Sequence, residues 1–432
     1  MAPKIGIIAE HKKGEGRIPL TPKQIKKIMD ENNPFDIVVQ PSAQRVFLDQ
    51  EFTSLGIEMT DDLSQANLVM AVKEIATKDI RGNQAYLYFS HTIKGQEYNM
   101  PMLEHILKVG ATLLDYELIS DDQDRRLVFF GRHAGLAGML NSLWAYGQRL
   151  KVLGVKSPFL KIKQARDYAD LDSIRNSIAA LAPEISDWLS DKPALIIGLT
   201  GYGNVSRGAQ EILDILPLLE VSAEEILSRD KSEYAGKIVK IVFKEEDMFE
   251  PRDTGRSFEL QDYFEHPEGY QSKFYQYLEK MDILVNCIYW NTNCPRLITL
   301  EEIKAHYADK PSLLVVGDIT CDIDGSIQFN VEATLSPDPV YIYDPETGKK
   351  IMGFVGKGPV VMAVDILPAE LPREASESFG EALIPFVVAM GECDYKKEFQ
   401  KLALPPEIKK AVIAHRGKLT PNYQYLDQYL KD

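Results

Sequence analysis

Charged side chains end two of the short apolar runs in the first third of the sequence. Lys73 and Glu74 follow the run 68–72, and His91 ends the run 85–90. A lysine next to an apolar run is unfavourable to bury unless a partner lies near it. With a lowered pKa, such a lysine can act as a base near neutral pH, and a histidine can transfer protons. This pair of residue types therefore predicts proton-transfer chemistry.

Further charged residues stand near the ends of apolar runs in the same third of the chain: Arg17, Lys94, Glu117 and Arg126. Arginine and lysine bind carboxylates, so the group suits a substrate that carries several of them. Taken singly, each residue is more often a solvated surface charge, and a lone histidine is more often structural. The prediction of a carboxylate-binding site rests on these charged residues occurring together in one part of the chain.

A glycine-rich loop follows the apolar run 194–197 and precedes a predicted helix. Its sequence is Gly198-Leu-Thr-Gly201-Tyr-Gly203-Asn204-Val205-Ser206-Arg-Gly208. Glycines allow a tight turn and let backbone N–H groups approach a pyrophosphate at a helix N-terminus. Ser206 stands where the third glycine of the usual G-x-G-x-x-G pattern belongs, and a tight turn without a ligand is the alternative. The strand, loop and helix in this order favour a bound dinucleotide, with Gly198, Gly201 and Gly203 in its site.

An acidic residue beyond the loop bears on the choice of dinucleotide. Glu220 follows Gly203 at about the distance where an acid binds the ribose 2′-hydroxyl of NAD. Pro217 interrupts the strand that should end there, and a solvated loop carboxylate is an equal alternative. NAD and NADP therefore both remain open.

Strands and helices that alternate along the chain must position these residues. Predicted strands cover 4–10, 36–40, 68–73, 85–91 and 112–118, and later 194–198, 238–243, 283–288, 313–319 and 360–366. Such alternation is typical of parallel sheets, whose ligands bind beyond the carboxyl ends of the strands. We therefore predict an α/β protein with two Rossmann-like domains, parallel sheets and a cleft between them.

The length of 432 residues exceeds what a single core usually supports. A predicted apolar helix at 134–150 leads into the second domain, and helices dominate after Pro372. We expect these last helices to pack on the first domain. The predicted substrate domain is then discontinuous, 1–132 plus 375–432, and the dinucleotide-binding domain covers 133–374 with the linking helix.

Composition narrows the class of protein. The net charge of −15 disfavours a nucleic-acid partner, and no apolar run approaches the roughly 20 residues of a membrane span. The four cysteines lack zinc-binding or disulfide spacing, so we expect no metal and a reducing compartment. Without a recognisable signal or transit segment, we expect a cytoplasmic protein.

Longer motifs carry a family resemblance that runs nearly end to end. Arg17 before Leu-Thr-Pro and Val-Lys-Glu at 72–74 would also suit alanine dehydrogenase, whereas His-Thr-Ile-Lys-Gly-Gln at 91–96 and Pro-Arg-Glu-Ala-Ser at 372–376 are more specific. The sequence resembles the lysine-ketoglutarate reductase and saccharopine dehydrogenase (lysine-forming) family, within the wider alanine dehydrogenase and transhydrogenase group.

The resemblance implies an oxidoreductase that interconverts saccharopine with L-lysine and 2-oxoglutarate, by NAD(P)-dependent hydride transfer and imine hydrolysis. It implies that Lys73 takes the proton of the secondary amine and that His91 is the acid and base of imine hydrolysis. The implied carboxylate-binding residues are Arg17, Lys94 and Arg126. The resemblance also implies that Glu74 and Glu117 balance the charge of Lys73 or bind the ammonium group of the substrate lysine. The implied cofactor-binding residues besides the glycines and Glu220 are Asn204, Val205, Ile288, Asp318 and Asp365.

Two other functions fit the same residues. An alanine-dehydrogenase-like amino-acid dehydrogenase would use ammonia instead of lysine, and a non-catalytic nucleotide-sensing relative would bind without turnover. Lys73 together with His91 disfavours the sensor, which has no need of proton-transfer groups.

Animal and plant relatives fuse a second dehydrogenase to this module, and at this length we expect a monofunctional chain. The physiological direction, the oligomeric state and the identity of the amine stay open.

Overall fold

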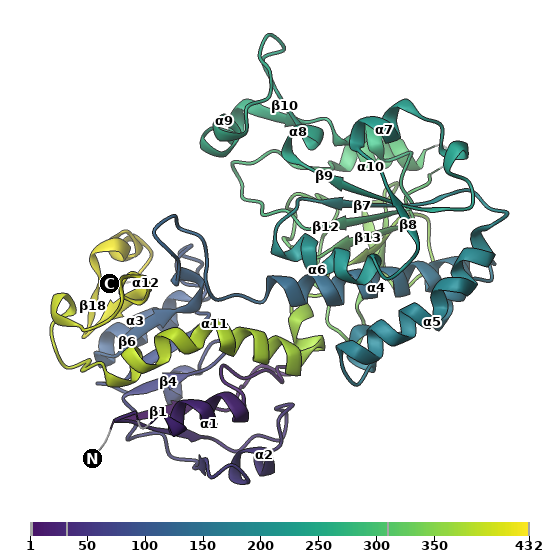
Figure 1. Cartoon of the computed structure of the whole chain (residues 1–432). Coiled ribbons are helices and arrows are strands. Elements are labelled where there is room, and N and C mark those ends of the chain that lie inside the picture. Colours follow the sequence, from purple (N-terminus) through teal and green to yellow (C-terminus); the bar gives the residue numbers. More distant parts are fainter. Residues whose placement is uncertain (1–2, 32, 309–310, 431–432) are drawn as a thin grey trace. The chain divides into compact units, whose positions relative to one another are not determined.

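A computed structural model describes residues 3–31, 33–308 and 311–430 (Figure 1). The chain divides into two compact units, one formed by Met1–Phe130 with Pro372–Asp432 and the other by Gly131–Leu371. We call them unit 1 and unit 2. Each contains an eight-stranded, mostly parallel sheet with helices on both faces, so the predicted α/β class with two Rossmann-like domains is confirmed.

The sheet of unit 1 is parallel from β3 to β6 and continues with two antiparallel strands at the β6 edge. Its order is β18 (Lys418–Leu419), β17 (Val412–His415), β6 (Thr112–Asp115), β5 (Ala85–Tyr88), β4 (Leu68–Met70), β1 (Lys4–Ile7), β2 (Asp36–Val39) and β3 (Glu58–Met59). Five of these strands coincide with predicted runs. The C-terminal part is therefore not only helical, because β17 and β18 extend the sheet.

The helices of unit 1 are α1 (Pro22–Asp30), α2 (Asp49–Thr53), α3 (Met100–Val109), α11 (Pro372–Glu392) and α12 (Pro406–Lys409), with 3₁₀ turns at Thr77–Asp79, Tyr116–Leu118, Phe399–Lys401 and Pro421–Tyr429. A capping box starts α1, in which the backbone N–H of Thr21 donates to the Gln24 side chain at 2.9 Å. The same side chain donates to the carbonyl of Glu377 in α11 at 2.8 Å. This cap thus ties the N-terminal and C-terminal segments of unit 1 together.

In the sheet of unit 2, β8 lies at one edge and β7 is the third strand from that edge. Its order is β15 (Lys349–Met352), β14 (Val340–Asp344), β16 (Val360–Met362), β13 (Val315–Asp318), β12 (Ile283–Asn286), β7 (Leu195–Thr200), β9 (Ile238–Phe243) and β8 (Leu218–Glu220). The strands from β16 to β8 are parallel, and β14 and β15 form an antiparallel hairpin. The chain thus runs from β7 to the edge strand β8 before it returns to β9, which lies between them.

The helices of unit 2 are α4 (Gly131–Val152), α5 (Leu171–Leu189), α6 (Asn204–Leu213), α7 (Ala223–Ser228), α8 (Glu245–Met248), α9 (Leu260–Glu265) and α10 (Leu300–Tyr307). A small hairpin pairs β10 (Phe249–Pro251) with β11 (Tyr270–Ser272), and 3₁₀ turns lie at Pro158–Lys161, Ala165–Asp167, Lys231–Tyr234, Pro267–Gly269, Phe274–Tyr277 and Leu367–Glu370. The described helices include none with both the length and the apolar character that a membrane crossing needs.

Helix α4 lies in the core of unit 2, side by side with α6 (Figure 1). Two glycines make this approach possible. A Cβ on Gly135 would lie 1.9 Å from the carbonyl oxygen of Val205, and a Cβ on Gly208 would lie 2.0 Å from that of Arg132. Gly208 thus serves the packing of α6 on α4, the helix that carries Arg132.

We predict that Gly135→Ala and Gly208→Ala each lower the free energy of unfolding of unit 2 by about 1–3 kcal/mol, because the added methyl group meets backbone that cannot move aside. Urea denaturation followed by circular dichroism measures the change. Gly269→Ala is the matched control, since a Cβ there has nothing within 4 Å. Three variants of equal stability would contradict the prediction.

Candidate active site

The carboxyl end of β4 is held by a glutamate from the neighbouring β1 segment. Glu10 accepts the backbone N–H of Val72 at 2.5 Å through Oε1 and that of Lys73 at 3.0 Å through Oε2. Strand β4 ends at Met70, so these bonds fix the residues that leave the sheet. The position of the Lys73 backbone therefore depends on Glu10.

Burial raises the pKa of Glu10 to about 8, and the hydrogen bonds from Val72 and Lys73 and the positive charge of Arg17 offset only part of this effect. The carboxyl group therefore changes charge close to neutral pH. Glu10 was not among the residues selected from the sequence. The signal that could have identified it is its place, an acid directly after an apolar first strand.

Glu74 forms a short hydrogen bond with His91. The Nδ1 of His91 lies 2.5 Å from Oε1 of Glu74, and both side chains are about one third exposed. Burial would raise the pKa of Glu74, but the hydrogen bond and the charge of His91 hold it below its usual value. Among the described residues no second hydrogen bond engages the imidazole, so its Nε2 remains available for proton exchange.

The turn before His91 is held by Asp115, the last residue of β6. Asp115 accepts the backbone N–H of Ser90 at 2.9 Å and its hydroxyl at 2.5 Å. Burial raises the pKa of Asp115 to about 6 in spite of these bonds. His91 itself has a φ of 51°, in the left-handed region that few side chains adopt, and Asn99 donates to its carbonyl at 2.9 Å. The ends of β5 and β6 thus fix the imidazole.

Arg17 lies buried against the ring of Phe130, with its guanidinium carbon 4.1 Å from the ring centre. Its Nε and one terminal nitrogen donate to the two carboxylate oxygens of Glu15 at 2.7 and 2.5 Å. Burial would raise the pKa of Glu15, but the charge and hydrogen bonds of Arg17 lower it. Glu15 thus already engages two nitrogens of the Arg17 guanidinium group. This pairing limits the predicted role of Arg17 in binding a substrate carboxylate.

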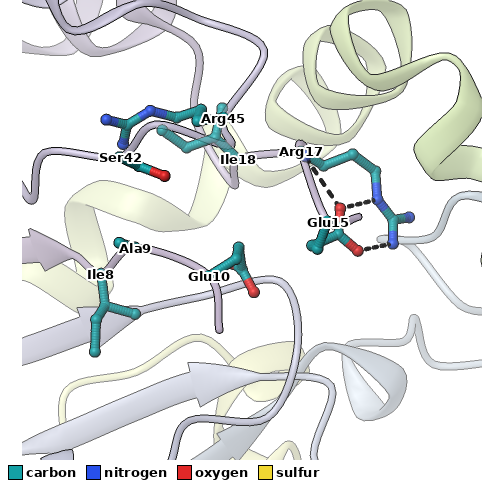
Figure 2. A pocket seen from close by; sticks show the side chains of 8 residues that line it. All are labelled: Ile8, Ala9, Glu10, Glu15, Arg17, Ile18, Ser42 and Arg45. Carbon is teal, nitrogen blue, oxygen red and sulfur yellow. Dashed lines mark hydrogen bonds and ion pairs between the residues drawn. The ribbon is translucent and has the colours of Figure 1, made fainter. Parts of the chain in front are cut away.

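A hollow in unit 1 lies beside Glu10, Glu15 and Arg17 (Figure 2). Its lining consists of Ile8, Ala9, Glu10, Glu15, Arg17, Ile18, Ser42 and Arg45. The charge of Lys73 contributes to the lowered pKa of both Glu15 and Glu74, so its ammonium lies near both carboxylates. Lys73, Glu74, His91 and Arg17 therefore occupy one end of the unit 1 sheet.

The other predicted substrate-binding residues lie nearby in the chain but differ in exposure. Glu117 and Arg126 form an ion pair with each other, in which the arginine side chain is 48% exposed. The backbone N–H of Glu117 donates to Asp115 at 2.8 Å, which links this pair to the turn before His91. Lys94 is exposed in the loop that follows His91. Arg126 and Lys94 are thus reachable from solvent, whereas Arg17 is not.

In unit 2 the glycine loop leaves β7 through a left-handed residue. Gly201 has a φ of 75°, and its N–H donates to the carbonyl of Phe243, the last residue of β9, at 2.8 Å. A Cβ on Gly201 would lie 3.2 Å from Cγ2 of Ile288, which follows β12. Glycine suits this position because of both its backbone conformation and the close approach.

Gly203 is the N-cap of α6, which begins with Asn204 and Val205. No side chain caps this end of the helix, and a Cβ on Gly203 would meet nothing within 4 Å. The first N–H groups of a helix carry a partial positive charge and bind phosphates. The loop and the start of α6 therefore have the room and the donors that a pyrophosphate requires.

Two other glycine-loop residues have packing roles. The sequence-based prediction placed Gly198 in the cofactor loop, but β7 continues to Thr200. A Cβ on Gly198 would lie 2.3 Å from Sδ of Met281, so its lack of a side chain serves the core. Ser206 is buried and accepts a hydrogen bond from Gln210 at 3.2 Å within α6.

Asp318 belongs to a buried polar network instead of a cofactor surface. It accepts hydrogen bonds from Asn286 and Asn330, both at 2.8 Å, and Asn286 in turn accepts one from Thr200. Burial raises the pKa of Asp318 against these bonds. The network joins the carboxyl ends of β7, β12 and β13, so Asp318 braces the site. Asp365, by contrast, is exposed beyond β16.

Glu220 does not occupy the position predicted for it. It ends the edge strand β8 and forms an ion pair with Lys240 at 2.8 Å, and Lys240 also pairs with Asp214 at 2.7 Å. Because β9 separates β8 from β7, the carboxyl end that lies beside the glycine loop belongs to β9. The distance along the sequence from the glycine loop does not identify the neighbouring strand end here. The next strand in the sequence, β8, is not the strand that lies beside β7 in the sheet.

Comparisons with known proteins agree with these two units. Residues 6–137 match the family model described as alanine dehydrogenase/PNT, N-terminal domain. The solved structure of an L-alanine dehydrogenase is similar with a TM-score of 0.64 and 15% identity, covering 99% of this chain and all of that one. A transhydrogenase from Sinorhizobium meliloti gives a TM-score of 0.54 at 16% identity, covering 97% and 99%. At these identities the likeness concerns the fold.

Sequence relatives are more specific. The alpha-aminoadipic semialdehyde synthase of Arabidopsis thaliana is 36% identical over 99% of this chain and 41% of that protein, and the mitochondrial one of Mus musculus is 33% identical over 96% and 46%. This chain thus spans less than half of their length. The lysine-forming, NAD(+) saccharopine dehydrogenase of Schizosaccharomyces pombe is 26% identical over 91% and 95%. The family resemblance found in the motifs is therefore confirmed, and this chain is similar over nearly its whole length to proteins with these names.

Proposed function

We propose that this chain is an oxidoreductase that interconverts saccharopine with L-lysine and 2-oxoglutarate, with NAD or NADP as the hydride carrier. The observation that carries the proposal is the grouping of Lys73, the Glu74–His91 pair and Arg17 at one end of the unit 1 sheet. Relatives whose names refer to this chemistry support it. Location in the cytoplasm and the absence of a nucleic-acid partner stay predictions from the sequence.

The two units have separate tasks in this proposal. Unit 1 binds the substrate and unit 2 binds the dinucleotide. Gly201, Gly203, Asn204 and Val205 fit a pyrophosphate, because the start of α6 has no side-chain cap and a Cβ on Gly203 would meet open space. A bound nicotinamide dinucleotide supplies or accepts the hydride. The remaining steps are proton transfers and binding interactions of the chain's own side chains.

Lys73 is the proposed acid and base at the secondary amine of saccharopine. In the lysine-forming direction it takes the amine proton while the hydride leaves the neighbouring glutarate carbon. Glu10 holds its backbone, and the carboxylates of Glu15 and Glu74 lie near its ammonium, so a proton gained there is electrostatically compensated.

His91 is the proposed acid and base in hydrolysis of the resulting imine. Glu74 engages Nδ1, which orients the ring and leaves Nε2 to remove a proton from the attacking water. The same nitrogen can return the proton to the departing lysine nitrogen. Glu74 therefore acts through His91 as a positioning residue.

We predict that oxidation of NADH or NADPH requires L-lysine and 2-oxoglutarate together. Loss of absorbance at the reduced-nicotinamide band, with each component omitted in turn, measures the requirement. An equal rate with ammonia in place of lysine would assign the chain to the alanine-dehydrogenase-like alternative. A raised melting temperature with ligands but no turnover would identify a sensor.

We predict that Lys73→Met and His91→Gln each lower kcat by roughly 10²–10⁴, the usual contribution of a general acid or base. The dissociation constant of the dinucleotide, measured by titration calorimetry, should change little because both residues belong to unit 1. Lys78→Met and His266→Gln are controls at solvent-facing positions. Near-normal kcat in both active-site variants across the pH range would refute the assigned roles.

We predict that Arg126→Ala raises KM for 2-oxoglutarate about tenfold or more, because its exposed guanidinium can bind a carboxylate bidentately. Its neighbour Arg125 is 72% exposed and pairs with Asp121, so Arg125→Ala is the matched control. Steady-state kinetics with 2-oxoglutarate as the varied substrate provide the measurement. If the two variants raise KM equally, Arg126 has no specific role.

A further inference from the structure

The loop that carries Lys94 runs from His91, beyond the end of β5, to Asn99, the N-cap of α3. Its two ends are joined, because the Asn99 side chain donates to the carbonyl of His91 at 2.9 Å. Within the loop, the N–H of Gly95 donates to the carbonyl of Thr92 at 2.9 Å. Lys94 is exposed, and its ammonium has no ion-pair partner among the residues that the structure describes. The direction of Lys94 therefore depends on what holds the backbone on either side of it.

The 3₁₀ turn Pro421–Tyr429, which we call the 421–429 turn, is anchored at the antiparallel edge of the unit 1 sheet. Thr420 is its N-cap, and the Thr420 hydroxyl donates to a carbonyl of β17 at 2.6 Å. The hydroxyl of Tyr423 donates to the carbonyl of Lys410 at 2.7 Å. Leu426 is fully buried in the same hydrophobic cluster as Tyr423. The turn can therefore support a neighbouring loop.

Two tyrosines of the 421–429 turn contact the residues on both sides of Lys94. On one side, the hydroxyl of Tyr425 donates to the carbonyl of Ile93 at 2.7 Å, and the Ile93 side chain packs against the cluster that holds the turn. On the other side, the ring of Tyr429 lies against Gly95, where a Cβ would be 2.5 Å from the ring. Gly95 has a φ of 64°, so both its conformation and this close approach favour glycine. The turn thus holds the backbone before and after Lys94.

The exposure of the two tyrosines distinguishes these contacts from core packing. Tyr425 is 47% and Tyr429 43% exposed, whereas Tyr423 of the same turn is 8% exposed. Loss of either exposed side chain therefore removes less buried apolar area from unit 1 than the loss of a core tyrosine would. It does release the loop beside Lys94. Because a lysine side chain is flexible, a fixed backbone narrows the region that its ammonium can reach.

We propose that Tyr425 and Tyr429 are positioning residues for Lys94, and that the 421–429 turn thereby sets the affinity for a substrate carboxylate. The inference rests on the proposed function, because Lys94 is one of the residues expected to bind the carboxylates of saccharopine. Neither tyrosine touches the substrate, and each acts through the loop backbone. A loop that is held before binding loses less conformational entropy when the ligand binds.

Hydrogen exchange measured by mass spectrometry tests the contacts without reference to turnover. Tyr425→Phe removes only the hydroxyl, Tyr429→Ala removes the ring, and Tyr429→Phe retains the ring. We expect the amides of 92–98 to exchange about threefold or more faster in the first two variants, and at the unsubstituted rate in Tyr429→Phe. Tyr275→Phe and Tyr275→Ala, at a position of unit 2 that is 59% exposed, are the matched controls. Unchanged exchange in both Tyr425→Phe and Tyr429→Ala would overturn the proposal.

Steady-state oxidation of saccharopine tests the positioning role. We expect KM for saccharopine to rise about threefold to tenfold in Tyr425→Phe and in Tyr429→Ala, the equivalent of one neutral hydrogen bond. The kcat and the dissociation constant of the dinucleotide should stay near the unsubstituted values, and Tyr429→Phe should behave as the unsubstituted chain. In a Lys94→Met background, Tyr429→Ala should raise KM no further, because a positioning residue has no effect once the group that it positions is gone.

Other outcomes separate the positioning role from the proposed function. If Lys94→Met leaves KM unchanged, or if its effect and that of Tyr429→Ala multiply, the turn does not act through Lys94 and the proposal is wrong while the proposed function stands. A lower kcat without a higher KM in the tyrosine variants would also overturn it. If the dinucleotide binds but neither saccharopine nor lysine with 2-oxoglutarate is turned over, the proposed function is wrong, and the positioning role with it. Melting curves check that each variant is folded.

Discussion

The two backbone hydrogen bonds that Glu10 accepts hold the chain where it leaves β4, and the arrangement of the unit 1 site depends on them. They fix the backbone of Lys73, and Glu74 is the next residue. Glu74 meets His91, whose turn is held from β6 by Asp115. Three strands thus contribute to one proton-transfer group, because a parallel sheet collects its carboxyl ends at one edge.

Unit 2 holds its strand ends with a different polar network. Asn286 and Asp318 connect β7, β12 and β13 through buried hydrogen bonds. Polar groups can be buried at such a place only when their hydrogen bonds are satisfied, and nearly every donor and acceptor in this network has a partner. Burial raises the pKa of Asp318, as it does for Glu10 and Asp115 in unit 1. In both units, buried acids brace the strand ends and more exposed residues remain for ligands.

This division explains why similar residues receive different roles. Arg17 and Arg126 are both arginines beyond strands of unit 1, and either could bind a carboxylate. Arg17 is buried and already bound by Glu15, whereas Arg126 keeps about half of its side chain exposed. Glu220 likewise has an internal partner, because Lys240 forms an ion pair with it. Burial and internal partners together thus decide which of these charged groups a ligand can reach.

The sequence by itself determined the two α/β units, the strands that carry Lys73 and His91, and the glycine loop before α6. These features depend on local patterns, namely apolar runs of strand length, turn glycines and helix starts, which neighbouring residues largely specify. Only the tertiary structure decided that β9, and not β8, lies beside β7, that β17 and β18 extend the first sheet, and that Glu10 holds Lys73. The pairing of strands and the partner of a buried charge depend on residues far apart in the chain, and no local spacing records them.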